Sequence, residues 1–214
     1  MNDTYKHKGL RKKMINELSA KGIYDQNILD AFFKIPRHFF LDLAFVEKAY
    51  TNIAFQIGAK QTISHPYTVA FQTQLLELGI GDKVLEIGTG SGFQTCILCC
   101  LGARVYSVER QKELFISAKH IIDRFGYSPK LYYGDGYKGV ELYQPYDKIL
   151  VTCGAPYVPR LLIDQLKVGG VMVIPIGEGE EQLMKKITKI SETKTKEEEF
   201  GVFKFVPMLE KKAK

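Results

Sequence analysis

Short apolar segments alternate with amphipathic segments along residues 83–176, and this alternation constrains the fold more than any other feature of the chain. The pattern predicts buried strands at 83–88, 104–109, 130–134, 147–152 and 171–176, and helices at 92–101, 112–125 and 156–166. Strands that are joined through helices lie parallel in one sheet. We therefore predict an α/β fold with a doubly wound, mostly parallel sheet.

The two ends of the chain lack this alternation. Residues 1–78 predict helices at 8–20, 25–34, 41–50 and 67–78, with an irregular polar stretch at 51–66. Near the other end, strand-like runs at 182–190 and 200–209 flank a charged turn and predict an antiparallel hairpin at the sheet edge. We expect one compact unit in which segment 1–78 packs on a core formed by residues 79–214.

Composition limits the class of protein. With 45% hydrophobic and 25% charged residues, the chain is expected to be globular rather than disordered. It contains no apolar run of the roughly 18 residues that a membrane span needs and no secretory signal pattern, so a cytoplasmic protein without membrane contact is expected. Cys96 and Cys99 form a C-x-x-C within a predicted buried helix and lack a second ligand pair, so no metal is expected.

The formal net charge of +6 permits nucleic-acid binding without establishing it. Lysines are interleaved with glutamates along 185–199, a pattern typical of a solvated surface. We expect no nucleic-acid partner and a monomeric protein.

A glycine loop is the strongest site signal. A predicted strand runs into Gly88, Gly90 and Gly92, and a helix follows, so backbone N–H groups at the helix start are available to a ligand. About 20 residues further on, the next strand ends in Glu109, which can accept hydrogen bonds from ribose hydroxyls.

The glycine spacing is G-x-G-x-G, not the G-x-G-x-x-G of dinucleotide-binding proteins. Glu86, two residues before the first glycine, would repel a pyrophosphate but suits a ligand with a cationic ammonium group. Asp135, in a Gly-Asp-Gly turn after the third strand, is a candidate acceptor for an adenine amino group. These carboxylates favour S-adenosylmethionine over a dinucleotide.

Two further segments have no role in a bare nucleotide-binding sheet: Pro36-Arg37-His38 and Gln61-Thr62-Ile63-Ser64-His65-Pro66. With the glycine loop, the strand ending in Glu109 and the Gly-Asp-Gly turn, they resemble the protein-L-isoaspartate O-methyltransferase family from about residue 8 to residue 190. The resemblance implies a Rossmann-like methyltransferase fold and S-adenosylmethionine as cofactor. It also implies methylation of the free α-carboxylate of L-isoaspartyl residues in damaged proteins, which initiates repair.

The resemblance places the family's active-site serine on Ser64, with Thr62, Ile63 and His65 beside it as substrate-binding residues. Ser64 is interpreted as an orienting hydrogen-bond donor rather than a covalent nucleophile. The cofactor-binding residues implied are Glu86, Gly88, Thr89, Gly90, Glu109, Arg110, Asp135 and Gly136.

Several interpretations stay open at this point. His65 departs from the family pattern and either adds positive charge for a carboxylate or only occupies space. Arg37 either pairs with a carboxylate elsewhere in the fold or attracts an acidic substrate, and His38 is expected to be structural. The alternative functions are an RNA, DNA or small-molecule methyltransferase and a catalytically silent module that binds the cofactor.

Overall fold

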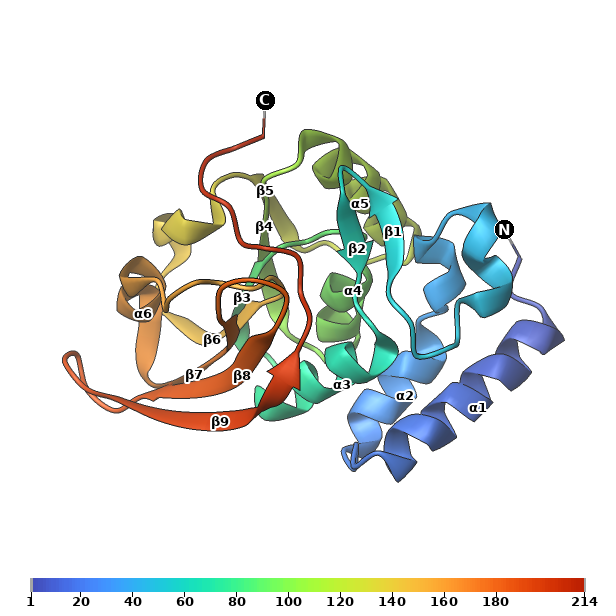
Figure 1. Cartoon of the computed structure of the whole chain (residues 1–214), viewed down its shortest axis with the longest axis horizontal. Coiled ribbons are helices and arrows are strands. Elements are labelled where there is room, and N and C mark those ends of the chain that lie inside the picture. The colour runs from blue at the N-terminus through green and yellow to red at the C-terminus, as the bar shows by residue number, and fades with distance from the viewer. Residues whose placement is uncertain (1, 214) are drawn as a thin grey trace.

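The computed structural model describes residues 2–213 and is organised around a seven-stranded sheet with the strand order β5-β4-β3-β6-β7-β8-β9 (Figure 1). Strands β3 to β7 pair in parallel, and β8 and β9 continue the sheet as antiparallel strands. This confirms the predicted α/β class. The seven strands are β3 (Lys83–Ile87), β4 (Arg104–Glu109), β5 (Lys130–Tyr133), β6 (Tyr146–Val151), β7 (Leu166–Ile176), β8 (Gln182–Lys189) and β9 (Thr195–Phe203).

Helices cover the sheet and form the N-terminal end of the molecule. They are α1 (Tyr5–Ala20), α2 (Gln26–Lys34), α3 (Pro66–Leu75), α4 (Phe93–Cys100), α5 (Lys112–Arg124) and α6 (Arg160–Gln165). Short 3-10 turns are η1 (Arg37–Phe40), η2 (Leu43–Lys48), η3 (Gly136–Lys138) and η4 (Glu141–Tyr143). Within residues 2–213, no helix has both the length and the apolar character that crossing a membrane requires.

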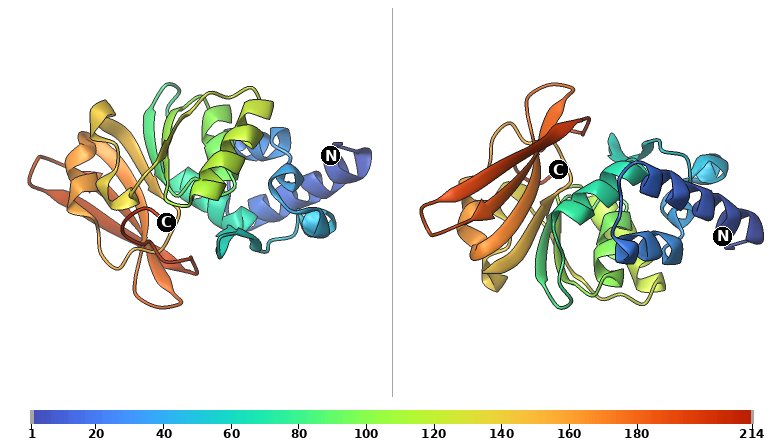
Figure 2. Two further views of the ribbon diagram at one scale, coloured as in Figure 1. Left: turned by 90° about the horizontal axis from the view of Figure 1, so that it is seen from above. Right: turned by 90° about the horizontal axis from the view of Figure 1, so that it is seen from below.

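The N-terminal helices share a hydrophobic core with two helices that flank the sheet. Phe32 of α2, Phe93 of α4 and Ile122 of α5 are all buried in one cluster, and the rings of Phe32 and Phe93 meet edge to face with centroids 5.6 Å apart. Figure 2 shows α1 and α2 at the opposite end of the molecule from β8 and β9. The N-terminal segment is thereby anchored beside the glycine loop, which directly precedes α4.

The stretch predicted to be irregular contains a β-hairpin of β1 (Phe55–Gly58) and β2 (Gln61–Ile63), separate from the main sheet. The helices predicted at 41–50 and 156–166 are also wrong in extent. The first is only the 3-10 turn η2, capped by the Asp42 side chain, and α6 begins at Arg160, after Pro159 in an extended conformation.

The predicted C-terminal hairpin is confirmed as antiparallel, but its second strand lies in the charged segment. Lys185 of β8 forms salt bridges with Glu197 (2.9 Å) and Glu199 (3.5 Å) of β9, so the alternating charges pair across strands rather than forming the turn. After β9, residues 204–213 form a C-terminal tail, seen in Figure 1 as the red trace that leaves β9 and runs past the central strands.

Candidate active site

A cavity of about 820 Å³, including its part open to solvent, lies at the carboxyl ends of the parallel strands. This is where open α/β sheets bind ligands. Segments far apart in the sequence line it: the β2 end and the turn after it, α3, the glycine loop and the start of α4, the end of β4, the loop after β5, the loop after β6, and the C-terminal tail. Among the predicted site residues, the lining includes Thr62, Ile63, Ser64, Gly88, Thr89, Gly90, Glu109, Arg110 and Gly136.

The glycine loop adopts a backbone that side chains would disturb. Gly88 has φ +97°, and a Cβ atom there would lie 2.5 Å from Oγ1 of Thr152. That hydroxyl donates to the carbonyls of Ile87 (2.9 Å) and Gly88 (2.7 Å) and so fastens the loop to the end of β6. These contacts favour one conformation of the loop, and a preorganised loop loses less entropy on binding a ligand.

The carboxylate of Glu109 closes the other side of the loop. One oxygen accepts the N–H of Gly90 at 2.8 Å, and the other accepts the N–H of Gln111 at 2.8 Å. Burial raises the pKa of Glu109, and these backbone donors oppose that increase. Each carboxylate oxygen has a second lone pair, so the group can still accept hydrogen bonds from ribose hydroxyls.

Ser64 occupies the turn between β2 and α3. Its carbonyl accepts a hydrogen bond from Arg37 at 2.8 Å, while the residue itself lines the cavity. Pro66 begins α3 at a position where a missing N–H costs little. Arg37 therefore holds the turn through the Ser64 carbonyl, and α3 fixes the residues that follow the turn.

Glu86 lies on β3, just before the glycine loop. Its side chain is fully buried and is not among the residues that line the cavity. Its direct contact with a cationic part of the ligand stays a prediction. One carboxylate oxygen accepts from the hydroxyls of Thr95 and Ser107, each at 2.6 Å, and the other has no partner. Burial raises the pKa of Glu86 to about 7, against the opposing effect of those two hydroxyls.

Asp135 also lies outside the cavity lining. One carboxylate oxygen accepts the N–H of Tyr137 at 3.0 Å, and the other accepts the N–H of Lys211 at 2.9 Å. The C-terminal tail thus contacts the carboxylate that is predicted to receive an adenine amino group, and a second lone pair on each oxygen stays available. Arg110 belongs to the same contact, since its Nε donates to the carbonyl of Lys211 at 3.1 Å.

His65 is the N-cap residue of α3, but its side chain makes no capping hydrogen bond and does not line the cavity. Burial lowers the pKa of His65, and the charges of Arg37 and Lys21 lower it further. Both effects disfavour the charged imidazole. They favour the interpretation in which His65 only occupies space over the one in which it adds positive charge.

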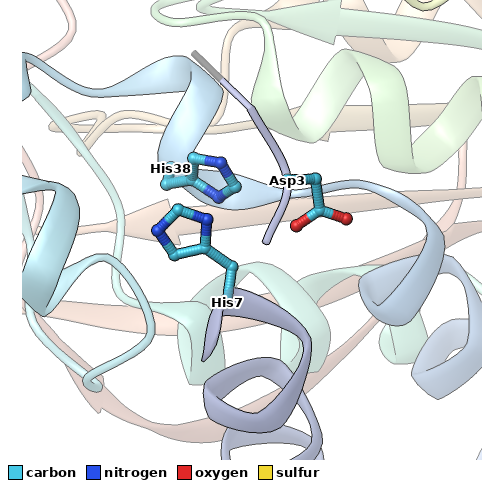
Figure 3. Close-up of side chains that lie close together, drawn as sticks. All are labelled: Asp3, His7 and His38. Carbon is cyan, nitrogen blue, oxygen red and sulfur yellow. The ribbon is translucent and has the colours of Figure 1, made fainter. Parts of the chain in front are cut away.

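Figure 3 shows a second polar cluster, formed by Asp3, His7 and His38, in which one potential ligand atom of each residue lies within 4.8 Å of the others. Arg11 already donates to both oxygens of Asp3, at 2.8 and 2.9 Å, and its charge opposes a metal cation. His38 Nδ1 lies 2.6 Å from the Tyr50 hydroxyl, and burial lowers the pKa of His38 to about 4. The cluster ties the N-terminal segment to η1.

Sequence reasoning missed several residues that line the cavity. Gln72 of α3 donates to the carbonyl of Val151 at 2.9 Å and joins α3 to β6. Gln94, in the first turn of α4, could have been suspected from its position after the glycine loop. The C-terminal tail gave no such signal in the sequence. It lines the cavity because the chain passes there after β9, and the residues that form this wall are Val206, Pro207, Met208 and Leu209.

The residues present fit a nucleoside cofactor. Gly136 is packed so closely that a Cβ atom would lie 2.5 Å from Ile87, and with Val108 and Met208 it offers an apolar surface to a base, beside the carboxylate of Glu109. This fold and site define an S-adenosylmethionine-dependent methyltransferase. The model of the protein-L-isoaspartate(D-aspartate) O-methyltransferase family, PCMT, matches residues 9–213. The chain belongs to that family.

Individual relatives agree. The protein-L-isoaspartate O-methyltransferase of Flavobacterium psychrophilum is 56% identical over 99% of this chain and 100% of its own length. That of Dictyoglomus turgidum is 47% identical over 96% and 94% of the two chains.

Solved structures share the fold. A protein-L-isoaspartate O-methyltransferase superposes with a TM-score of 0.84 at 30% identity, over 92% of this chain; this chain spans 65% of that one. A β-aspartate methyltransferase of Plasmodium falciparum, solved in complex with S-adenosyl-L-homocysteine, gives a TM-score of 0.81 at 24% identity, over 93% and 98% of the two chains.

Proposed function

We propose that this chain transfers the methyl group of S-adenosylmethionine to the free α-carboxylate of L-isoaspartyl residues in damaged proteins, with Ser64 orienting that carboxylate. The observation that carries the proposal is the shared cavity: the turn bearing Ser64 and the glycine loop line the same space. An acceptor held by the first is therefore adjacent to a cofactor held by the second.

The chemistry requires little of the protein beyond binding. A carboxyl group with a reference pKa near ~4 is ionised at pH 7 and is already a nucleophile. S-adenosylmethionine supplies an activated methyl group on a sulfonium. Since no proton must be removed from the acceptor, no general base is needed, and the absence of a Ser–His–Asp arrangement in the cavity lining does not count against catalysis.

Rate enhancement then comes from positioning and from partial dehydration of the acceptor. In our proposal the Ser64 hydroxyl and the backbone N–H groups of the turn replace water around one carboxylate oxygen. That leaves the other oxygen free to attack in line. Thr62 and Ile63, on the same strand end, form the adjoining wall of the cavity.

The cofactor-binding role is divided among the loop and its neighbours. The backbone at Gly88, Thr89 and Gly90 lets the cofactor approach closely. Glu109 accepts hydrogen bonds from the ribose hydroxyls. Gly136 leaves room for the base. Glu86 contributes indirectly, from beneath the loop, through the hydroxyls of Thr95 and Ser107.

A peptide pair tests the function. An L-isoaspartyl peptide and its normal aspartyl counterpart are incubated with the protein and methyl-labelled S-adenosylmethionine. Base-labile label should appear in the isoaspartyl peptide alone. Equal labelling of both peptides, or labelling of neither, would contradict the proposal.

We also propose that the protein acts as a single chain in the cytoplasm. The turn bearing Ser64, the glycine loop and Glu109 meet within a single chain, so the proposed chemistry needs no residue from a second copy. All four cysteines are free thiols, which suits a reducing compartment. Sedimentation at assay concentration tests the monomer.

A further inference from the structure

Arg37 is a fully buried cation directly beneath the turn that bears Ser64. Its guanidinium donates to three backbone carbonyls: Ser64 at 2.8 Å, Ile53 at 3.1 Å and Ala49 at 3.4 Å. One side chain therefore connects the Ser64 turn to the loop that precedes the β1–β2 hairpin.

No carboxylate within residues 2–213 forms a salt bridge with Arg37, so the first of the two interpretations left open for it, pairing with a carboxylate of the fold, is wrong. The guanidinium lies instead over the rings of Phe55 and Phe93, with centroids 5.7 and 5.8 Å away. Phe93 lines the cavity and begins α4. Burial lowers the pKa of Arg37 to about 9, which still leaves it charged at neutral pH.

A buried charge without a counter-ion is costly, because desolvation is not repaid by an opposite charge. Arg11 differs from Arg37 in this respect. Its side chain is also buried, but it forms a salt bridge with Asp3 at 2.8 Å. The carbonyls around Arg37 satisfy most of its donors, yet within residues 2–213 its Nε has no partner and no carboxylate neutralises its charge. The proposed substrate brings an anion to the other side of this same turn.

We propose that Arg37 is a positioning residue for the methyl acceptor, which fixes the Ser64 turn through the Ser64 carbonyl and makes the site prefer a carboxylate over a neutral group. This rests on the proposed function. Fixing the turn needs the several N–H donors of the guanidinium, whereas the preference for a carboxylate needs only a positive charge. Substitutions of Arg37 can therefore separate the two effects.

The test compares the wild type with Arg37→Lys and Arg37→Gln. For each, calorimetry in the presence of S-adenosyl-L-homocysteine, which has no methyl group to transfer, measures the affinity for an isoaspartyl peptide carrying the α-carboxylate and for its α-carboxamide analogue. Arg37→Lys should keep the carboxylate preference while kcat falls about tenfold. Arg37→Gln should lose at least about fivefold of the preference, as expected when a nearby charge is removed.

Arg11→Gln is the matched control, because it removes a buried arginine remote from the cavity lining and should leave the preference unchanged. Affinity for S-adenosyl-L-homocysteine checks that each variant is folded. The inference is overturned if the wild type shows no carboxylate preference, if Arg37→Lys loses it, or if Arg37→Gln retains it in full. A wild type that methylates no isoaspartyl peptide would instead refute the proposed function.

Discussion

The Glu109 carboxylate accepts the backbone N–H of Gly90 at 2.8 Å, so the end of β4 and the glycine loop are held together by one side chain. Replacing Glu109 with glutamine leaves only one acceptor oxygen for the N–H groups of Gly90 and Gln111 and removes the charge that favours ribose hydroxyls. We expect Glu109→Gln to weaken S-adenosyl-L-homocysteine binding by about 10- to 100-fold, as measured by calorimetry.

Glu141→Gln serves as the control, since Glu141 is exposed and does not line the cavity. Unchanged affinity in Glu109→Gln would mean that this carboxylate only braces the loop and does not contact the ligand.

Ser64→Ala removes the hydroxyl that is proposed to orient the acceptor but leaves the backbone of the turn intact. Turnover of an isoaspartyl peptide should fall about 10- to 100-fold, as when one preorganised donor is lost, with little change in cofactor affinity. Steady-state kinetics and calorimetry on the same preparation separate the two quantities. Ser128→Ala, at an exposed position, should match the wild type. A large loss of cofactor binding would show that Ser64 belongs to the cofactor site.

Gly88→Ala introduces a Cβ atom 2.5 Å from Thr152 Oγ1 at a residue with φ +97°. We expect it to destabilise the fold by more than about 2 kcal/mol, since strain and a steric clash add. The control is Gly126→Ala, where φ is +74° but nothing lies within 4 Å, so strain acts alone at about 1 kcal/mol. Urea unfolding measures both, and equal losses would show that the Thr152 contact relaxes without cost.

The raised pKa of Glu86 predicts a dependence of stability on pH. Between its ordinary value of 4.5 and about 7, the unfolded chain loses the proton while the folded chain keeps it. The stability that this group contributes is therefore present below pH 4.5 and lost as pH rises to 7, by on the order of 1–3 kcal/mol. Glu86→Gln cannot titrate, so its stability relative to the wild type should increase from pH 5 to pH 8.

Unfolding of the cofactor-free protein at both pH values checks this, with the exposed Glu178→Gln as control. If the wild type and Glu86→Gln showed parallel pH profiles, the buried carboxyl would not be the titrating group.

The parallel sheet was predictable because each apolar run is followed by a segment of helical period, and this order leaves few alternatives. The β1–β2 hairpin was not. Its turn residues Ala59 and Lys60 have φ of 47° and 56°, a conformation for which glycine or asparagine is the usual signal. Strand β9 was predicted too far along the chain, because its charged residues suggested a turn. Only the register of the sheet shows that Lys185 of β8 pairs with Glu197 of β9.

The site was predictable where the backbone defines it and less so where side chains meet across the fold. Glycines after a strand indicate a loop wherever the chain goes next, so Gly88 and Gly90 were identified from local sequence alone. Glu86 accepts hydrogen bonds from Thr95 and Ser107, and Asp135 accepts the N–H of Lys211, which lies 76 positions further along the chain. Local patterns carry no information on such partners.

The wall formed by Val206 to Leu209 has a consequence for biosynthesis. A growing polypeptide displays the glycine loop and Glu109 long before these residues leave the ribosome, and until then the cavity is open on that side. We therefore expect the complete cavity to hold the cofactor only after these residues have folded against the sheet.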